Sequence, residues 1–89
     1  MHVILSDVSG AIHRTDSVTY DEMLNHFEGD AAELTDQIQE MVTLFSRFKQ
    51  MTHLNLEIDG LKTWFNPDNV VWIRIENFDE FAEKTGITL

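Results

Sequence analysis

Residues 54–65 read LNLEIDGLKTWF, and most of the expected architecture can be built outward from this stretch. At its centre, Asp59-Gly60 is the strongest short signal for a two-residue hairpin turn. Pairing outward from the turn gives one nearly continuous apolar face, made of Leu54, Leu56, Ile58, Leu61, Thr63 and Phe65. On the other face Glu57 opposes Lys62, a pair of opposite charge, and Asn55 opposes Trp64. Turn, core face and charge pair agree on one register, so the sequence predicts an antiparallel hairpin.

A third strand is predicted immediately downstream. Asn66-Pro67-Asp68-Asn69 suits a type I turn with proline at its second position. Residues Val70 to Glu76 then alternate, with Val71, Ile73 and Ile75 on one face and Val70, Trp72, Arg74 and Glu76 on the other. We therefore expect the three strands to form an antiparallel meander.

The residues upstream of this meander predict two helices. Thr19 and Glu22 form a capping box for a short helix from Tyr20 to Glu28. Asp30 is placed to cap a longer amphipathic helix from Ala31 to Gln50, whose apolar residues recur at steps of three and four. This helix, about 30 Å long, is expected to lie across the apolar face of the meander.

Both ends of the chain carry weaker signals. The strands His2–Leu5 and Ala11–His13, on either side of the turn Ser6–Gly10, predict an N-terminal hairpin. Near the C-terminus, Asp79 is placed to cap a last turn or two of helix, with Phe81 and Ala82 facing inward and Gly86 as its stop. The expected fold is an α+β two-layer single domain, residues 1–89, in the order β(β)-α-α-β-β-β-α.

Composition limits where the protein works and what it binds. The chain has 89 residues, a formal net charge of −10 and no cysteine. No stretch is long and apolar enough for a signal peptide or a membrane span, and the lack of cysteine fits a reducing compartment, so we expect a cytoplasmic protein. The negative charge disfavours direct binding to nucleic acid or to an anionic membrane.

The negative charge is segregated along the chain. Residues 16–40 hold eight acids and no Lys or Arg: Asp16, Asp21, Glu22, Glu28, Asp30, Glu33, Asp36 and Glu40. Residues 76–83 hold four more acids and again no Lys or Arg: Glu76, Asp79, Glu80 and Glu83. Such a surface is either a solvated face that keeps a small protein soluble, or an anionic surface complementary to a basic partner.

The two tryptophans are candidate apolar anchors. In the expected register Trp64 and Trp72 both point away from the face that packs on the long helix. Either the N-terminal hairpin or the C-terminal segment covers them, or a partner or second subunit does. Tryptophan is enriched at the centres of binding sites.

Signals for catalysis and for metal binding are weak. The four glycines stand singly at 10, 29, 60 and 86, without the spacing of a phosphate-binding loop. Glu22 and His26, one helical turn apart, are the best local metal pair, and no further ligand is evident. Ser9 with His13 or His2 could pair as nucleophile and base across the first hairpin. We expect no catalysis, no cofactor and no metal.

The segment Asp59–Ile73 resembles the strand, turn and Asn-Pro arrangement of several short bacterial and phage proteins, a flagellar family among them. The long helix departs from the nearly all-β layout of that family. The resemblance therefore implies no function for this chain.

The leading hypothesis is a small acidic interaction module that binds or inhibits a basic, nucleic-acid-binding protein. In size and charge it resembles the acidic DNA-mimic inhibitors that phages use against host nucleases. The expected contact residues are the acids of the helical region, with one or both tryptophans as anchors: Asp21, Glu22, Glu28, Asp30, Glu33, Asp36, Glu40, Trp64 and Trp72. The alternatives are a homo-oligomer, such as a homodimer, joined through the open face or edge of the meander, and a small metal-dependent or acid–base enzyme.

Overall fold

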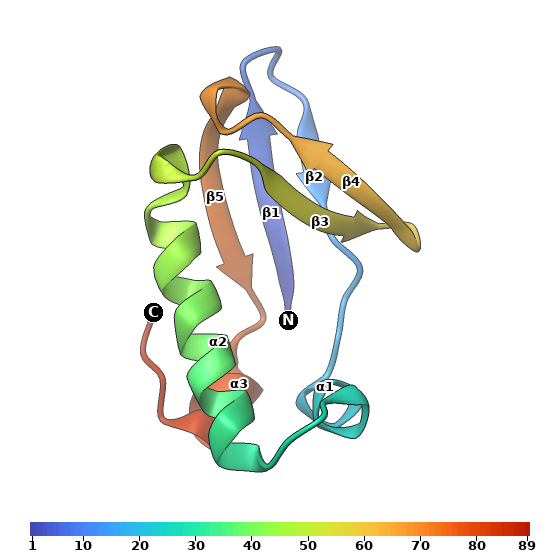
Figure 1. Ribbon diagram of the computed structural model, residues 1–89. Coiled ribbons are helices and arrows are strands. Elements are labelled where there is room, and N and C mark those ends of the chain that lie inside the picture. Colours follow the sequence, from blue (N-terminus) through green and yellow to red (C-terminus); the bar gives the residue numbers. More distant parts are fainter.

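Three helices and five antiparallel strands make up the fold in the computed structural model, which describes residues 1–89 (Figure 1). The elements in chain order are β1 His2–Asp7, β2 Ile12–Arg14, α1 Tyr20–His26, α2 Ala31–Ser46, β3 Leu54–Ile58, β4 Leu61–Phe65, β5 Val70–Glu76 and α3 Asp79–Thr85. Two short 3₁₀ turns, Phe48–Gln50 and Pro67–Asn69, precede β3 and β5. The α+β class and the element order are confirmed.

The expected three-stranded meander is wrong, because β5 does not pair with β4. The strands form two sheets: a three-stranded sheet in the order β2-β1-β5, and the two-stranded β3–β4 hairpin. β1 carries the run Val3-Ile4-Leu5, all three buried, and lies in the middle of its sheet between β2 and β5. The turn Pro67–Asn69 carries the chain from the hairpin to β1, and the backbone N–H of Val8 donates to Asn69 at 2.8 Å. The N-terminal hairpin therefore supplies two of the three strands of the main sheet.

The β3–β4 hairpin has the register that Asp59-Gly60 predicts. Its pairs run from Ile58 opposite Leu61 to Leu54 opposite Phe65. Glu57 and Lys62 lie directly opposite, as expected, but their charged groups form no ion pair. Instead, the hairpin turn is held by Asp16, whose carboxylate accepts from the backbone N–H groups of Asp59 at 2.8 Å and Gly60 at 2.9 Å.

The expected faces of β5 are reversed at its first residues. Opposite β5, Ser6 of β1 pairs with Trp72 and the next residue, Asp7, pairs with Val70, so Val71 has no partner on β1. This β-bulge inserts one extra residue and changes which side chains face inward. Val70 is fully buried and Val71 is 55% exposed, the opposite of the simple alternation, whereas Ile73 and Ile75 face the core as predicted.

The helices begin largely where their capping residues predict. Thr19 caps α1 by accepting from the Glu22 N–H, and Asp30 caps α2 by accepting from the Glu33 N–H at 2.8 Å. Both end before the expected residues, α1 at His26 and α2 at Ser46. The start of α3 differs as well.

At α3 the N-cap is Phe78, without a side-chain bond, and not Asp79. Phe81 is buried and Ala82 packs on the core, as expected. Gly86 ends α3 with φ of 75°, a left-handed conformation that favours glycine.

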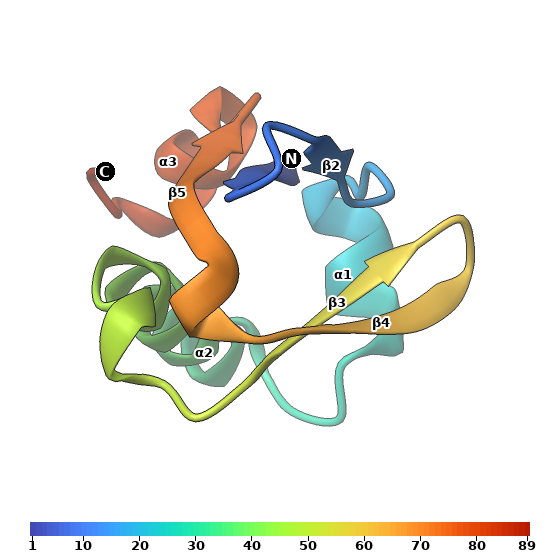
Figure 2. The same ribbon diagram turned by 90° about the horizontal axis from the view of Figure 1, so that it is seen from above.

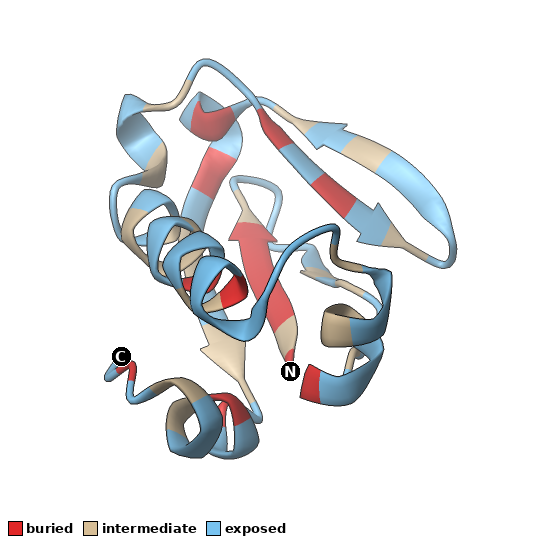
Figure 3. Cartoon of the chain, turned by 60° about the horizontal axis from the view of Figure 1, so that its bottom comes forward, coloured by how far each residue is buried: buried red, intermediate tan, exposed pale blue.

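The hydrophobic core is divided into two clusters. The first joins α1, α2 and α3 to the start of β1: Met1, Tyr20, Leu34, Ile38, Phe78, Phe81 and Ile87. The second joins the two sheets: Leu5, Leu54, Leu56 and Val70. α2 spans both, since Leu34 and Ile38 belong to the first and Phe45 packs on the second. Most of the helical surface is exposed, whereas β1 is buried along most of its length (Figure 3).

The molecule exposes somewhat more surface than a compact chain of its size. A folded chain of 10.3 kDa has an expected accessible surface of about 5,400 Å². The observed surface is 5905 Å², and the radius of gyration, 13.3 Å, exceeds the value of about 12 Å expected for this length. The extents of 39 × 25 × 22 Å show an elongated shape, which accounts for both values.

Candidate interaction site

The largest concavity lies between α1, α2, β3 and the start of β1. It has a volume of about 750 Å³, within the range of small-molecule pockets. Seen from above, these elements surround the middle of the molecule (Figure 2). Met41, which packs on the first core cluster, and Phe45, which packs on the second, both line it. The concavity therefore lies where the core divides.

A second hollow adjoins the first beside α2. It has a volume of about 320 Å³ and shares Met41, Phe45 and Asn55 with the larger one. We call the two together the methionine groove, because all four methionines of the chain line them. The main apolar lining residues are Met1, Val18, Met23, Phe27, Met41, Leu44, Phe45, Met51 and Leu56. Methionine side chains are flexible and polarizable, and they adapt to varied apolar partners.

The charged residues that line the methionine groove are acids. They are Asp16, Glu22, Glu40 and Glu57, and no Lys or Arg lines either hollow. His2, His26 and His53 also line the hollows, and the N-terminal amine of Met1 donates to the Val18 carbonyl at 2.8 Å. An apolar floor with an anionic rim favours a ligand that is apolar on one side and cationic around it.

All seven acids predicted as contacts are exposed: Asp21, Glu22, Glu28, Asp30, Glu33, Asp36 and Glu40. None forms an ion pair with a Lys or Arg of the chain. The one ion pair between an acid and a Lys or Arg joins Glu76 and Arg74 at 3.7 Å. Asp30 also caps α2, and the Glu22 carboxylate accepts from the hydroxyl of Thr19, the N-cap of α1, at 3.1 Å. Glu22 and Glu40 lie on the groove itself, so the acidic surface and the methionine groove adjoin.

The two tryptophans do not share a face, contrary to expectation. Trp64 on β4 is 68% exposed and stacks on His53, with ring centroids 4.8 Å apart. His53 lines the second hollow, which places Trp64 beside the methionine groove. Trp72 belongs to the other sheet, where it is half-buried with the Arg74 guanidinium 4.5 Å from its ring. They separate because β5 joins β1 and not β4.

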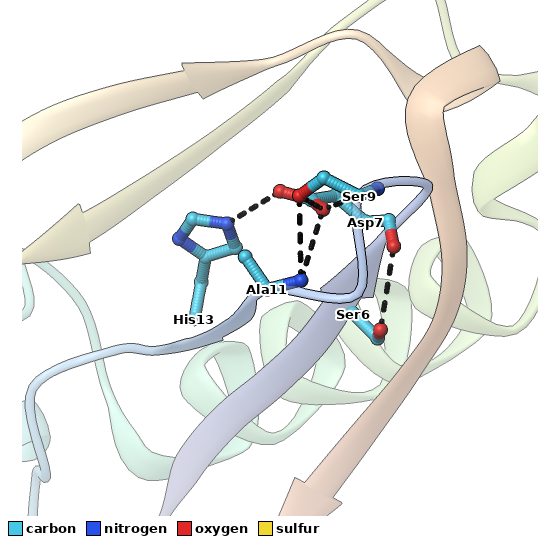
Figure 4. A network of polar contacts seen from close by, with 5 residues as sticks. All are labelled: Ser6, Asp7, Ser9, Ala11 and His13. Atoms are coloured by element: carbon cyan, nitrogen blue, oxygen red, sulfur yellow. Dashed lines mark hydrogen bonds and ion pairs between the residues drawn. The ribbon is translucent and has the colours of Figure 1, made fainter.

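The turn between β1 and β2 contains a network centred on Asp7 (Figure 4). Asp7 accepts hydrogen bonds from the Ser9 hydroxyl and the N–H groups of Ser9 and Ala11, and His13 Nε2 lies 2.8 Å from its other oxygen. The Ser9 hydroxyl bond, then the His13 contact, lowers the pKa of Asp7 from 3.8 to about 2. Ser9 and His13 thus both contact Asp7 and not each other, unlike a nucleophile–base pair. His2 bonds Glu76 at the far end of the strand.

The metal pair suggested by spacing, Glu22 and His26, lies on the methionine groove. No third His, Asp or Glu completes it, since no group of three or more such side chains is placed to hold a metal ion. Among the helices, none is both long enough and apolar enough to cross a membrane.

The sequence revealed the acids of this site but not the groove. Met23 and Met41 recur at helical spacing, and such spacing predicts core residues whether or not a neighbouring element covers them. The distance between α1 and β3 depends on the path of the segment between β2 and α1, which contains Asp16. No local sequence pattern specifies that path. The available signal was that α1 and α2 each carry one methionine together with two or three acids. Compared with known proteins, the chain matches no family model, no curated protein and no solved structure.

Proposed function

We propose that this protein is an interaction module that binds a basic partner protein through the acidic surface of α1 and α2. The observation that supports this most is that seven acids, on these helices and on the segment between them, are exposed without a Lys or Arg ion pair. Unpaired carboxylates repel one another and lower the stability of the folded chain. A cationic partner relieves that repulsion, and the long-range attraction speeds its association.

The basic partner that fits best is one whose cationic surface otherwise contacts phosphate. Along α2, Glu33, Asp36 and Glu40 fall on one side of the helix, about 5 Å apart along its axis. Phosphates of one DNA strand are about 3.4 Å apart along the axis. The row of carboxylates is therefore sparser than a phosphate backbone. We propose inhibition through competition for a positively charged surface, and not through carboxylates at the positions of individual phosphates.

Affinity capture from the source organism, with wild type and the variant Glu33→Gln/Asp36→Asn/Glu40→Gln in parallel, tests the proposal. We expect the wild type to retain a basic protein that high salt releases, and the variant to retain much less. Glu83→Gln, an exposed acid on α3, is the matched control and should behave as wild type. If the captured protein binds wild type and the triple variant equally well, and its affinity is the same in low and high salt, the electrostatic mechanism is refuted.

A second candidate is a homo-oligomer formed through the outer face of the three-stranded sheet. The supporting observation is a set of three paired residues across that sheet: Ser6 of β1 pairs with Ile12 of β2 and with Trp72 of β5. Ile12 is 59% exposed. Light scattering at high protein concentration decides this point. A mass of 10.3 kDa at every concentration would remove the oligomer.

A further inference from the structure

We propose that the methionine groove takes up the apolar side of a cationic amphipathic helix, which the partner supplies. This inference rests on the proposed function and adds the form of the partner. The acidic surface alone favours any partner with positive charge. The groove also requires a partner whose apolar side chains lie along one side. The occupant is then a single segment of the partner and not merely a basic patch.

The shape of the groove favours a peptide segment over a compact ligand. Two hollows of about 750 and 320 Å³ share Met41, Phe45 and Asn55, so they adjoin at these residues and the apolar lining extends beyond either hollow alone. A volume of this size holds several apolar side chains and not a folded domain. A helix presents such side chains in a row at steps of three and four residues, and helix-in-groove docking uses this row as its anchor.

The charges of the rim fix the second property of the segment. Asp16, Glu22, Glu40 and Glu57 line the groove, with no Lys or Arg among the lining residues. An amphipathic helix whose apolar row enters the groove carries its polar residues along the rim, where Lys and Arg are favoured and acids are repelled. Asp16 is already bonded to the hairpin turn, so Glu22, Glu40 and Glu57 are the carboxylates we assign to the segment.

The methionines suit such an occupant. Met23 and Met41 are half-buried and pack on the edge of the first core cluster. Their unbranched side chains change rotamer at little cost, so they can contact apolar side chains of different shapes. The groove should therefore depend on amphipathicity more than on one particular sequence.

Two synthetic peptides separate the groove from the acidic surface. The first is a helix of about 18 residues, five turns, with leucines on one face and lysines on the other. The second has the same composition, with leucines and lysines redistributed so that no face is apolar. We expect the amphipathic peptide to bind about tenfold more tightly or better, since burying even one leucine side chain contributes a factor of that size.

Methionine methyl signals in the NMR spectrum of the wild-type protein report where the peptide binds. We expect the amphipathic peptide to shift the signals of Met23, Met41 and Met51, and to leave the indole N–H of Trp72, on the other sheet, unmoved. The variant Met23→Gln/Met41→Gln should bring the two affinities together. Leu61→Gln, an exposed residue outside the groove, is the control and should preserve the difference.

Each outcome has a definite meaning. Equal affinity for both peptides, or tighter binding of the amphipathic one without methionine shifts, overturns the groove inference and leaves the acidic surface as the binding site. Failure of both peptides to bind in low salt refutes the electrostatic proposal itself. Because the methyl signals are measured on wild type, the result does not depend on the variants folding.

Discussion

Asp36 offers a single substitution that should raise stability and weaken partner binding at once. It is exposed, forms no ion pair, and lies three residues after Glu33 and four before Glu40 on α2. Like charges at these spacings destabilise a helix by about 0.2–0.5 kcal/mol per pair. Replacing Asp36 with asparagine removes both pairs and hardly changes helix propensity. We therefore expect Asp36→Asn to stabilise the fold by about 0.4–1 kcal/mol.

Urea unfolding in low and high salt measures this effect. With a slope of about 1 kcal/mol per molar urea, the midpoint should rise by about 0.4–1 M. The gain should appear in about 0.01 M salt, where the Debye length is about 30 Å, and largely vanish in about 1 M salt, where it is about 3 Å. The control is Asp68→Asn, since Asp68 has no acid within three or four residues and should show no comparable gain.

Two results would refute the reasoning. If Asp36→Asn is no more stable than wild type in low salt, the carboxylates of α2 do not repel one another as their spacing implies. If the gain persists unchanged in high salt, its origin is not electrostatic. In either case the unpaired acids no longer imply a cationic partner, and the solubility interpretation of the acidic surface gains support.

Three further predictions test other parts of the fold. The pKa of Asp7 is lowered to about 2, so between about pH 2 and 4 the folded state binds fewer protons than the unfolded state. The ionised Asp7 carboxylate therefore contributes its full stabilisation above about pH 4, and this stabilisation is lost as the pH falls through about 2. Acid unfolding titrations should show this loss in wild type and not in Asp7→Asn. Leu5→Ala, at a fully buried position, should cost about 2–5 kcal/mol in urea unfolding, whereas Leu61→Ala, at a residue 69% exposed, should stay within about 0.5 kcal/mol. Asp16→Ala should cost about 1–2 kcal/mol and speed amide exchange in the β3–β4 turn, because it removes two backbone hydrogen bonds; unchanged exchange there would contradict the anchoring role.

Local patterns predicted the elements of this fold well, because each depends on neighbours in the sequence. Asp59-Gly60 sets the register of β3 and β4 through the geometry of one turn. Thr19 and Asp30 mark helix starts because their side chains accept from N–H groups three residues ahead. The strand bounds of Val70–Glu76 were also correct.

What the sequence could not predict is how elements far apart in the chain pair. A meander was the simplest arrangement for three consecutive strands, but it leaves β1 with one neighbour. In the structure β5 pairs with β1, which carries the buried run Val3-Ile4-Leu5, and this pairing depends on the whole fold. The bulge at Val71 follows from that pairing, and so does the separation of Trp64 from Trp72. The methionine groove was hidden for the same reason, since it lies between elements that no local pattern positions.

The pairing of β1 with β5 has a consequence for synthesis on the ribosome. Translation at about 5–20 residues per second leaves β1 waiting roughly 3–13 s before β5 is made. During that time the apolar strand His2–Asp7 has only β2 as a neighbour, and its open edge can pair with another nascent chain. The carboxylates of residues 16–40 are made in this interval, and repulsion between the carboxylates of two chains opposes such pairing.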